Sequence, residues 1–243
     1  MAGARFNLMT MKPLDSAAVN GALLDAFEPD FTPTHASADE HARDEYRRDA
    51  FLAAIVAARR QLGGTFRPCG VTRKKAPKYT GYFWSCATGL PAYFKLMFAD
   101  VAPAQVAPVF ALADRLAAVL DLDYGTAHLT FPDATPLYNQ GGDTPPKDLQ
   151  KFGPMLLGAR TWLGPHIVGL IGRDKLAATG VQIATTPWGA LRIDLLPDLA
   201  NQPMAALQAK QSEVMSQLEP TGVFALFKLG AITKKGPSWK PLP

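Results

Sequence analysis

The stretch VQIATTPWGALRIDLL, residues 181–196, has the pattern of a β-hairpin. Apolar residues alternate on both arms: Val181 and Ile183 on the first, and Leu191, Ile193 and Leu195 on the second. Thr-Pro-Trp-Gly lies between the arms and supplies turn-forming residues. A hairpin is antiparallel, and helices are expected elsewhere in the chain. The stretch therefore favours an α+β fold.

The same periodicities predict the remaining elements. Aromatic and apolar runs at 79–85 and 92–100 predict a second hairpin. Further strands are expected at 4–11, 125–132 and 222–230, and helices at 15–27, 42–62, 103–121 and 203–218. Residues 28–41, which are polar and contain prolines, and the basic stretch 67–78 are expected to be loops.

The domain organisation follows from this order of elements. We expect a single α+β domain over residues 1–243, in which antiparallel hairpins and a mixed sheet are packed by several helices. Both halves contain a hairpin, a helix and a strand, so two similar lobes, 1–132 and 155–230, are an alternative arrangement. The Pro/Gly-rich segment 133–154 would then be the surface loop that joins them.

Composition places the chain among ordinary globular proteins. Of its 243 residues, 48% are hydrophobic and 19% are charged, and the formal net charge is +4. The start of the chain lacks the pattern of a secretory signal, and no apolar run has the length of a membrane span. Cys69 and Cys86 are too few for a disulfide framework. We expect a cytoplasmic protein with reduced thiols.

The stretch LGARTWLGPHIVGLIG, residues 157–172, contains a histidine in a distinctive setting. Gly164 is expected to cap a helix, with Pro165 at its first position and His166 in its first turn. A helix N-terminus favours a neutral imidazole, which is able to act as a base. No partner for His166 is evident from the sequence. We therefore favour a structural role, in which Trp162 and the apolar residues after His166 anchor the helix in the core.

The other histidines give no stronger indication of chemistry. His128 alternates with Thr126 and Thr130, on a strand face expected to meet water or a hydrogen-bonding partner. His35 and His41 lie in a polar segment without the spacing of a zinc site. Nucleotide-binding, serine-hydrolase and zinc-protease motifs are absent from the sequence. We expect no catalytic residue, metal ion or cofactor.

Two segments carry concentrated charge of opposite sign. Residues 25–49 are rich in Asp and Glu, a pattern that suits a surface for a basic partner. Residues 67–78 carry five basic residues and no acidic one: Arg67, Arg73, Lys74, Lys75 and Lys78. Aromatic residues flank the basic segment, as in some modules that bind single-stranded nucleic acid. A solvated loop is the simpler interpretation.

Three segments together resemble a family of bacterial immunity proteins: YGTAHLTFPD at 124–133, GARTWLGPHIVGLIGRDKLAA at 158–178, and PWGALRIDLLPD at 187–198. The pattern is similar to the immunity protein 52 family and the related type VI secretion immunity family. The resemblance is clearest in 158–198. The residues that carry it are Trp162, Gly164, Pro165, Gly172, Trp188 and Gly189.

The resemblance implies an α+β protein without catalytic activity that binds and neutralises a cognate secreted toxin. For this family the implied toxin is a nuclease, met in the cytoplasm. Because nucleases have basic clefts, we expect acidic residues to bind the toxin, and the candidates are Asp39, Glu40, Asp44 and Glu45. Two alternatives stay open: a small hydrolase or transferase that uses His166 or His128, and a nucleic-acid-binding module that uses the basic segment.

Overall fold

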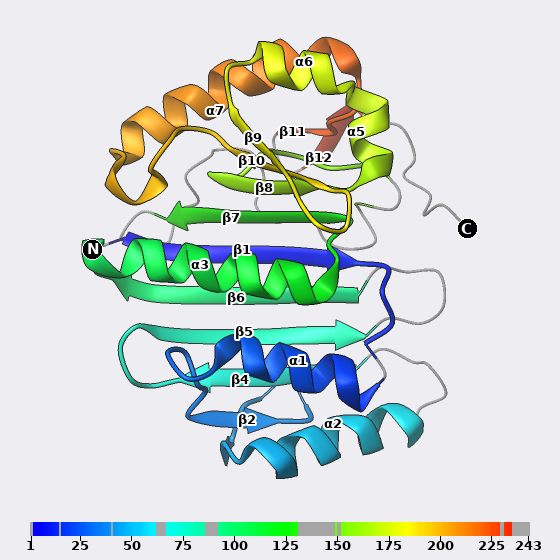
Figure 1. Ribbon diagram of the computed structural model, residues 1–243, viewed down its shortest axis with the longest axis vertical. Helices are drawn as coiled ribbons and strands as arrows, with labels where there is room; N and C mark the ends of the chain where they lie inside the picture. The colour runs from blue at the N-terminus through cyan, green and yellow to red at the C-terminus, as the bar shows by residue number, and fades with distance from the viewer. Residues whose placement is uncertain are drawn as a thin grey trace.

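The computed structural model describes residues 2–14, 16–39, 41–61, 67–85, 92–130, 149, 152–228 and 231–234. Its main element is a ten-stranded sheet in the order β3-β2-β4-β5-β6-β1-β7-β8-β10-β9 (Figure 1). The strands of this sheet are β1 Ala2–Thr10, β2 His35–Ser37, β3 Asp44–Glu45, β4 Arg67–Arg73, β5 Lys78–Ser85, β6 Ala92–Val101, β7 Tyr124–Thr130, β8 Arg160–Leu163, β9 Gln182–Thr185 and β10 Leu191–Asp194.

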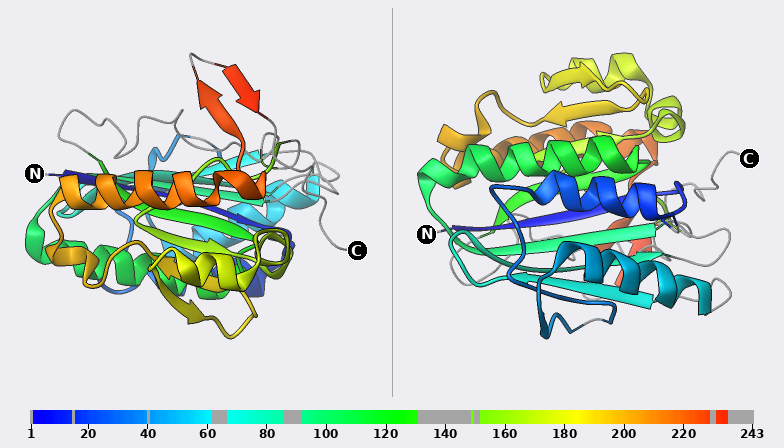
Figure 2. Two further views of the ribbon diagram at one scale, coloured as in Figure 1. Left: turned by 90° about the horizontal axis from the view of Figure 1, so that it is seen from above. Right: turned by 60° about the horizontal axis from the view of Figure 1, so that its bottom comes forward.

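The helices and a small second sheet complete the fold. The helices are α1 Ala17–Phe27, α2 Arg48–Gln61, α3 Pro103–Leu120, α5 Pro165–Ile171, α6 Arg173–Ala178 and α7 Met204–Leu218, with the 3-10 helices η1 Leu199–Asn201 and η2 Glu219–Thr221. The strands β11 Leu226–Lys228 and β12 Ala231–Lys234 form a separate hairpin. This hairpin projects away from the large sheet (Figure 2, left).

The expected α+β class is confirmed, and so is the hairpin from which it was inferred. Strands β9 and β10 pair antiparallel, with Ile183 opposite Ile193. Every pairing among the described strands of the large sheet is antiparallel, so the expectation of a mixed sheet is wrong for them. Because β7 pairs with both β1 and β8, one sheet connects residues 2–130 with residues 152–228.

Helices α1, α2 and α3 lie side by side on one face of the sheet (Figure 1). Cross-strand partners share a face, and the pairs Phe6–Leu96 and Phe83–Phe94 lie on the face under these helices. All four side chains are at most 2% exposed. We call this side the helix face, and the other side the opposite face. The main core lies between the helix face and α1 to α3.

Local sequence signals explain where several helices begin. Ser16 caps α1 and accepts a hydrogen bond from the Val19 amide at 3.2 Å. Pro103 and Pro165 occupy the first turns of α3 and α5, where a missing N–H removes no helical hydrogen bond. Helix α3 is long and apolar enough, by length and composition, to cross a membrane. Here its apolar stripe, which includes Val109 and Leu116, is buried on the sheet.

The β7–β10 end of the sheet is covered on both sides. Every residue of β7 is buried, which requires packing against both faces of that strand. Helix α3 covers the helix face there, and α7 runs along the opposite side (Figure 2). The Tyr124 hydroxyl on the opposite face donates to the Leu156 carbonyl at 2.7 Å. The side chains of β7 are therefore held away from water on both faces.

Two expectations near the other end of the sheet are wrong. Residues 42–47 were expected to begin a helix, but Asp44 and Glu45 form β3, and α2 begins at Arg48. The segment 28–41 was expected to be a loop but contains β2, whose His35 pairs with Glu45. An acid-rich start suits a helix N-terminus locally, but pairing with β2 overrides this preference.

The basic segment 67–78 was also expected to be a loop, and most of it is β4. Cys69 and Val71 alternate into the core, at 1% and 0% exposure, while the charges lie at the ends of the strand. Most of the Pro/Gly-rich loop 133–154 lies outside the described residues. Within the described residues, the strand expected over 222–230 contains β11, and the strand β12 follows it.

Candidate functional site

An acidic pocket lies between β2, β3 and the start of α2. Its volume is about 400 Å³. Ala36, Ala38 and Phe51 supply apolar surface, while Asp44 and Glu45 line it with two carboxylates against the single guanidinium of Arg47. A cavity with this lining is able to take the stem of a long basic side chain and its charged head together.

The carboxylates around the acidic pocket differ in how firmly they are held. Asp44 accepts a hydrogen bond from the Ser37 hydroxyl at 3.0 Å, and Asp39 accepts one from the His41 amide at 2.8 Å. The Glu45 side chain is 81% exposed, and its one ion pair among the described residues is with the 79% exposed Arg47, at 3.9 Å. Such a contact contributes little to stability, so the Glu45 charge is available to a partner. The fourth predicted residue, Glu40, lies outside the described residues.

The basic residues of segment 67–78 separate into two groups. Lys74, Lys75 and Lys78 lie at the turn between β4 and β5 and are exposed, whereas Arg67 begins β4 at its other end. Arg73 donates to the Thr32 carbonyl at 2.7 Å, which fixes its guanidinium against the loop before β2. Four of the five residues expected to form one nucleic-acid surface therefore lie at this turn, and Arg67 lies at the other end of β4.

Tertiary structure places the acidic and basic segments next to each other. His35 of β2 pairs with Glu45 of β3 on one side and with Thr72 of β4 on the other. The Lys74 ammonium lies 3.0 Å from His35 Nε2. A surface with neighbouring patches of opposite sign thus occupies this end of the sheet.

The histidines proposed for catalysis lie apart from each other and from the acidic pocket. His128 is 3% exposed on the opposite face, beside Thr126 and Thr130 and across from Arg5 of β1. Of the two settings expected for this face, water and a hydrogen-bonding partner, burial excludes water. His166 lies in the first turn of α5 as expected, and its buried Nε2 has no hydrogen-bond partner in the described part of the chain. His35 and His41 do not join a metal cluster, because within the described residues no three His, Cys, Asp or Glu side chains are grouped around a metal-sized site.

The residues that carry the family resemblance form a corner at the start of β7. The Gly164 amide donates to the Asp123 carbonyl at 2.8 Å, and Trp188 Nε1 donates to the neighbouring Leu122 carbonyl at 3.3 Å. A Cβ on Gly164 would lie 2.8 Å from the Asp123 carbonyl oxygen, so only glycine fits. Pro165 lies near Gly189 across the same corner, since a Cβ at Gly189 would be 3.7 Å from the proline ring.

The same corner contains Trp162 and a glycine between two helices. Trp162 is 1% exposed and lies on the helix face of β8. Gly172 ends α5 and precedes α6 with φ of +91°, a conformation that disfavours other residues. These positions build the scaffold, in agreement with the structural interpretation of the His166 stretch.

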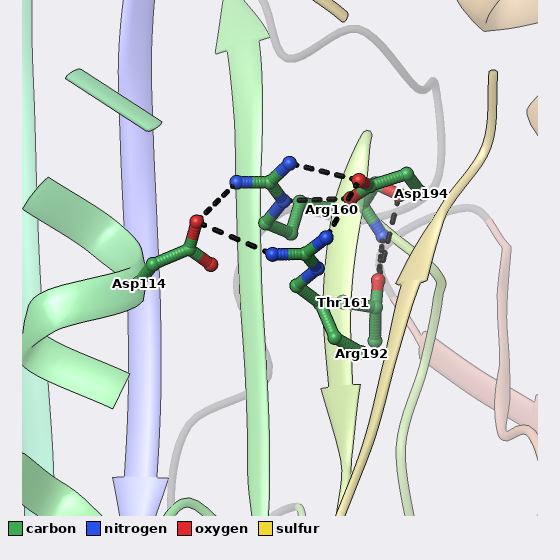
Figure 3. A network of polar contacts seen from close by, with 6 residues as sticks. Asp114, Arg160, Thr161, Arg192 and Asp194 are labelled. Atoms are coloured by element: carbon green, nitrogen blue, oxygen red, sulfur yellow. Dashed lines mark hydrogen bonds and ion pairs between the residues drawn. The ribbon is translucent and has the colours of Figure 1, made fainter. Parts of the chain in front are cut away.

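A partly buried network of charges at the β7–β10 end was not predicted from the sequence. Arg160 of β8 donates from Nε to Asp194 of β10 at 2.6 Å, and from Nη1 to Asp114 of α3 at 2.6 Å (Figure 3). Arg192 approaches the same carboxylates at 3.5 and 3.9 Å. The sequence separations, 34 and 46 residues for the Arg160 bonds, explain why no local pattern revealed the network.

In this network the attraction between Arg and Asp side chains opposes the cost of burying their charges. Burial raises the pKa of Asp114 from 3.8, although Arg160 and Arg192 act in the opposite direction. Burial by itself would lower the pKa of Arg160, but its hydrogen bond with Asp194 and the attraction of Asp114 raise it overall. Two Arg and two Asp side chains compensate one another, and Arg160 also lies over the Phe110 ring at 5.4 Å.

The chain is similar in fold to a solved structure. No model of a protein family matches the chain, and no curated protein matches it in sequence. Among solved structures, the Pseudomonas aeruginosa T6SS (type VI secretion system) protein PA0821 matches with a TM-score of 0.59 at 14% identity. The match covers 98% of this chain and 79% of that one. The two chains share a fold.

The shared fold includes both regions described above. Because 98% of this chain is covered, the likeness includes the acidic end of the sheet as well as the β7–β10 end. At 14% identity most side chains differ, so the likeness concerns the path of the backbone.

Proposed function

We propose that the protein is a non-catalytic immunity protein that binds and neutralises a cognate toxin of a type VI secretion system. The observation that carries the proposal is the fold it shares, over 98% of its length, with a T6SS protein. The resemblance of segment 158–198 to immunity families points in the same direction. In this proposal the protein acts in the cytoplasm, and the toxin is a nuclease.

The acidic pocket is the proposed contact surface for the toxin. Nucleases bind an anionic substrate in basic clefts, and the exposed Glu45 carboxylate complements such a cleft. The apolar floor of the pocket, which includes Ala36 and Phe51, accommodates the aliphatic stem of a partner lysine or arginine. Asp44, held by Ser37, is pre-ordered for contact with its charged head.

The proposal is tested by a pull-down of the tagged protein with the toxin encoded beside it, expressed as an inactivated variant. We expect a stable one-to-one complex, confirmed by size-exclusion chromatography with light scattering. No complex with a correctly folded bait would refute the proposed function.

A matched pair of charge reversals then tests the surface. Glu45→Lys should weaken the complex roughly tenfold, which is about 1.4 kcal/mol. The control Asp174→Lys reverses an exposed charge on α6, at the other end of the sheet, and should leave the affinity unchanged. Equal affinities for both variants would remove the acidic pocket from the interface while leaving the function in place.

A further inference from the structure

A second surface lies beside the acidic pocket, on the opposite face of the sheet. It is a groove of about 320 Å³ over the outer ends of β4, β5 and β6. Cross-strand register aligns Thr72 with Thr80 and Thr80 with Met97, so these three side chains form a continuous row. Ala99 extends the row, opposite Lys78. The floor of the groove is therefore formed largely by methyl and methylene groups.

The rim of the groove is basic. Lys74 and Lys78 line it, and Lys75 lies between them at the turn. In the described part of the chain the side chains of Lys75 and Lys78 make no ion pair or hydrogen bond, and the Lys74 ammonium contacts the His35 ring. Asp100 is the one acidic residue in β4 to β6. The three ammonium groups therefore produce a local positive potential that is not compensated by contact.

The groove lacks the features that single-stranded nucleic acid requires. Bases stack on exposed aromatic rings, but the aromatic residue in the lining, Tyr79, is 2% exposed and donates its hydroxyl to Phe31. Arg73 is held by the Thr32 carbonyl. These observations favour a protein ligand.

We propose that this groove binds an acidic segment of a protein partner, with an apolar side chain of that segment on Met97 and Thr80 and its carboxylates on Lys74 and Lys78. The proposal deepens the proposed function and rests on it for the identity of the partner. In the sheet order, only β2 separates β3, which lines the acidic pocket, from β4, which lines the groove.

The groove is tested first without the toxin. The full chain is labelled with [methyl-13C]methionine, and the Met97 methyl signal is assigned by comparison with Met97→Leu. The probe is the peptide Ac-Glu-Leu-Glu-Leu-Glu-Leu-NH2. We expect it to shift the Met97 signal with saturation, and to lose at least tenfold in affinity against Lys78→Glu. The matched control Lys175→Glu, on α6, should bind the peptide like the wild type.

Three further probes separate the alternatives. A Lys-Leu peptide of the same length should leave the Met97 signal unchanged, and hexaglutamate should bind more weakly because it lacks an apolar side chain. A twelve-nucleotide single strand should also leave the signal unchanged. A Met97 shift with DNA equal to that with the Glu-Leu peptide would overturn the proposal in favour of nucleic acid. Absence of any shift with the Glu-Leu peptide would overturn it outright.

The toxin complex provides the second test. Lys74→Glu combined with Lys78→Glu should weaken the complex at least tenfold, and Lys175→Glu should not. Unfolding in urea confirms that each variant is folded. An unchanged affinity for the double variant would overturn the groove as a toxin-binding surface while the proposed function stands. If the wild type forms no complex, the proposed function fails, and the peptide titration alone decides whether the groove binds acidic segments.

Discussion

The two ends of the large sheet use charge in opposite ways. At the β7–β10 end, Arg160 and Asp194 are each 13% exposed and hydrogen-bonded to one another. At the β2–β5 end, Glu45 is 81% exposed and Lys75 and Lys78 have no charged partner in the described residues. The first arrangement links α3, β8 and β10 within the fold. The second leaves charges of both signs available for association.

This difference indicates which substitutions should affect stability and which should affect binding. A buried ion pair has given up its hydration, so the loss of one member leaves the other uncompensated. An exposed charge keeps its hydration, and its removal changes the unfolding free energy little. The predictions below test this contrast, beginning with the largest effect.

Arg160→Ala should lower the free energy of unfolding by about 3–5 kcal/mol, because Asp114 and Asp194 lose their shared partner. The control is Arg192→Ala, in the same network but with contacts of only 3.5 and 3.9 Å. Arg192→Ala should lower the free energy of unfolding by less than about 1 kcal/mol. Urea unfolding followed by circular dichroism measures both. Similar losses for the two variants would show that the network is not centred on Arg160.

Gly164→Ala should lower the unfolding free energy by roughly 1–3 kcal/mol, because the new Cβ would meet backbone atoms of Asp123 that cannot move aside. Gly169→Ala, one turn further along α5, is the matched control, since nothing lies within 4 Å of its Cβ position. The unfolding free energy of that variant should rise by about 0.5–1 kcal/mol, because alanine has a higher helix propensity than glycine. A stable Gly164→Ala protein would contradict the close approach at the corner.

The buried carboxyl groups should make a smaller, pH-dependent contribution. Burial raises the pKa of Asp114 and of Asp123 in the folded protein above 3.8. Just above pH 3.8 the folded state therefore binds more protons than the unfolded state, and stability falls as pH rises through this interval. Asp114→Asn and Asp123→Asn should each remove part of that slope in urea titrations between pH 3.5 and 6. A slope that becomes steeper in the variants would show that ion pairing lowers these pKa values.

Lys75→Glu should have the smallest effect on stability, within about 0.5 kcal/mol of the wild type, because its side chain is exposed and makes no polar contact in the described residues. The Tm measured by differential scanning fluorimetry at low and high salt checks this. A loss of several degrees would mean that the basic turn contributes to the fold, which would weaken the contrast between the two ends.

Much of the framework could be predicted from local pattern. The 181–196 hairpin, helix α3 with Pro103 in its first turn, and helix α7 after Pro203 all follow from periodicity and capping residues. The first turn of α5, with Gly164, Pro165 and His166, was predicted in the same way. These elements can be predicted locally, because the periodicity of hydrophobic residues and the effects of proline and glycine on the backbone extend over only a few residues.

The elements that were missed depend on partners distant in sequence. Asp44 and Glu45 suit a helix start locally, and they form a strand because β2 pairs with them. The charges at both ends of β4 favour a loop locally, whereas the alternation of Cys69 and Val71 into the core is what makes this segment a strand. The Arg160 network joins residues 34 and 46 positions apart, so no local pattern contains it.

For the candidate site, the sequence determined which segments are charged, and the tertiary structure determined where those charges lie and how exposed they are. The sequence alone showed one acidic and one basic segment, since charge is a property of residue type. Only the fold places β3 and β4 on either side of β2, and only the fold exposes Glu45 while burying Asp194. The reason is physical: whether a charge stabilises the fold or remains available to a partner depends on its hydration and its neighbours, and long-range strand pairing sets both.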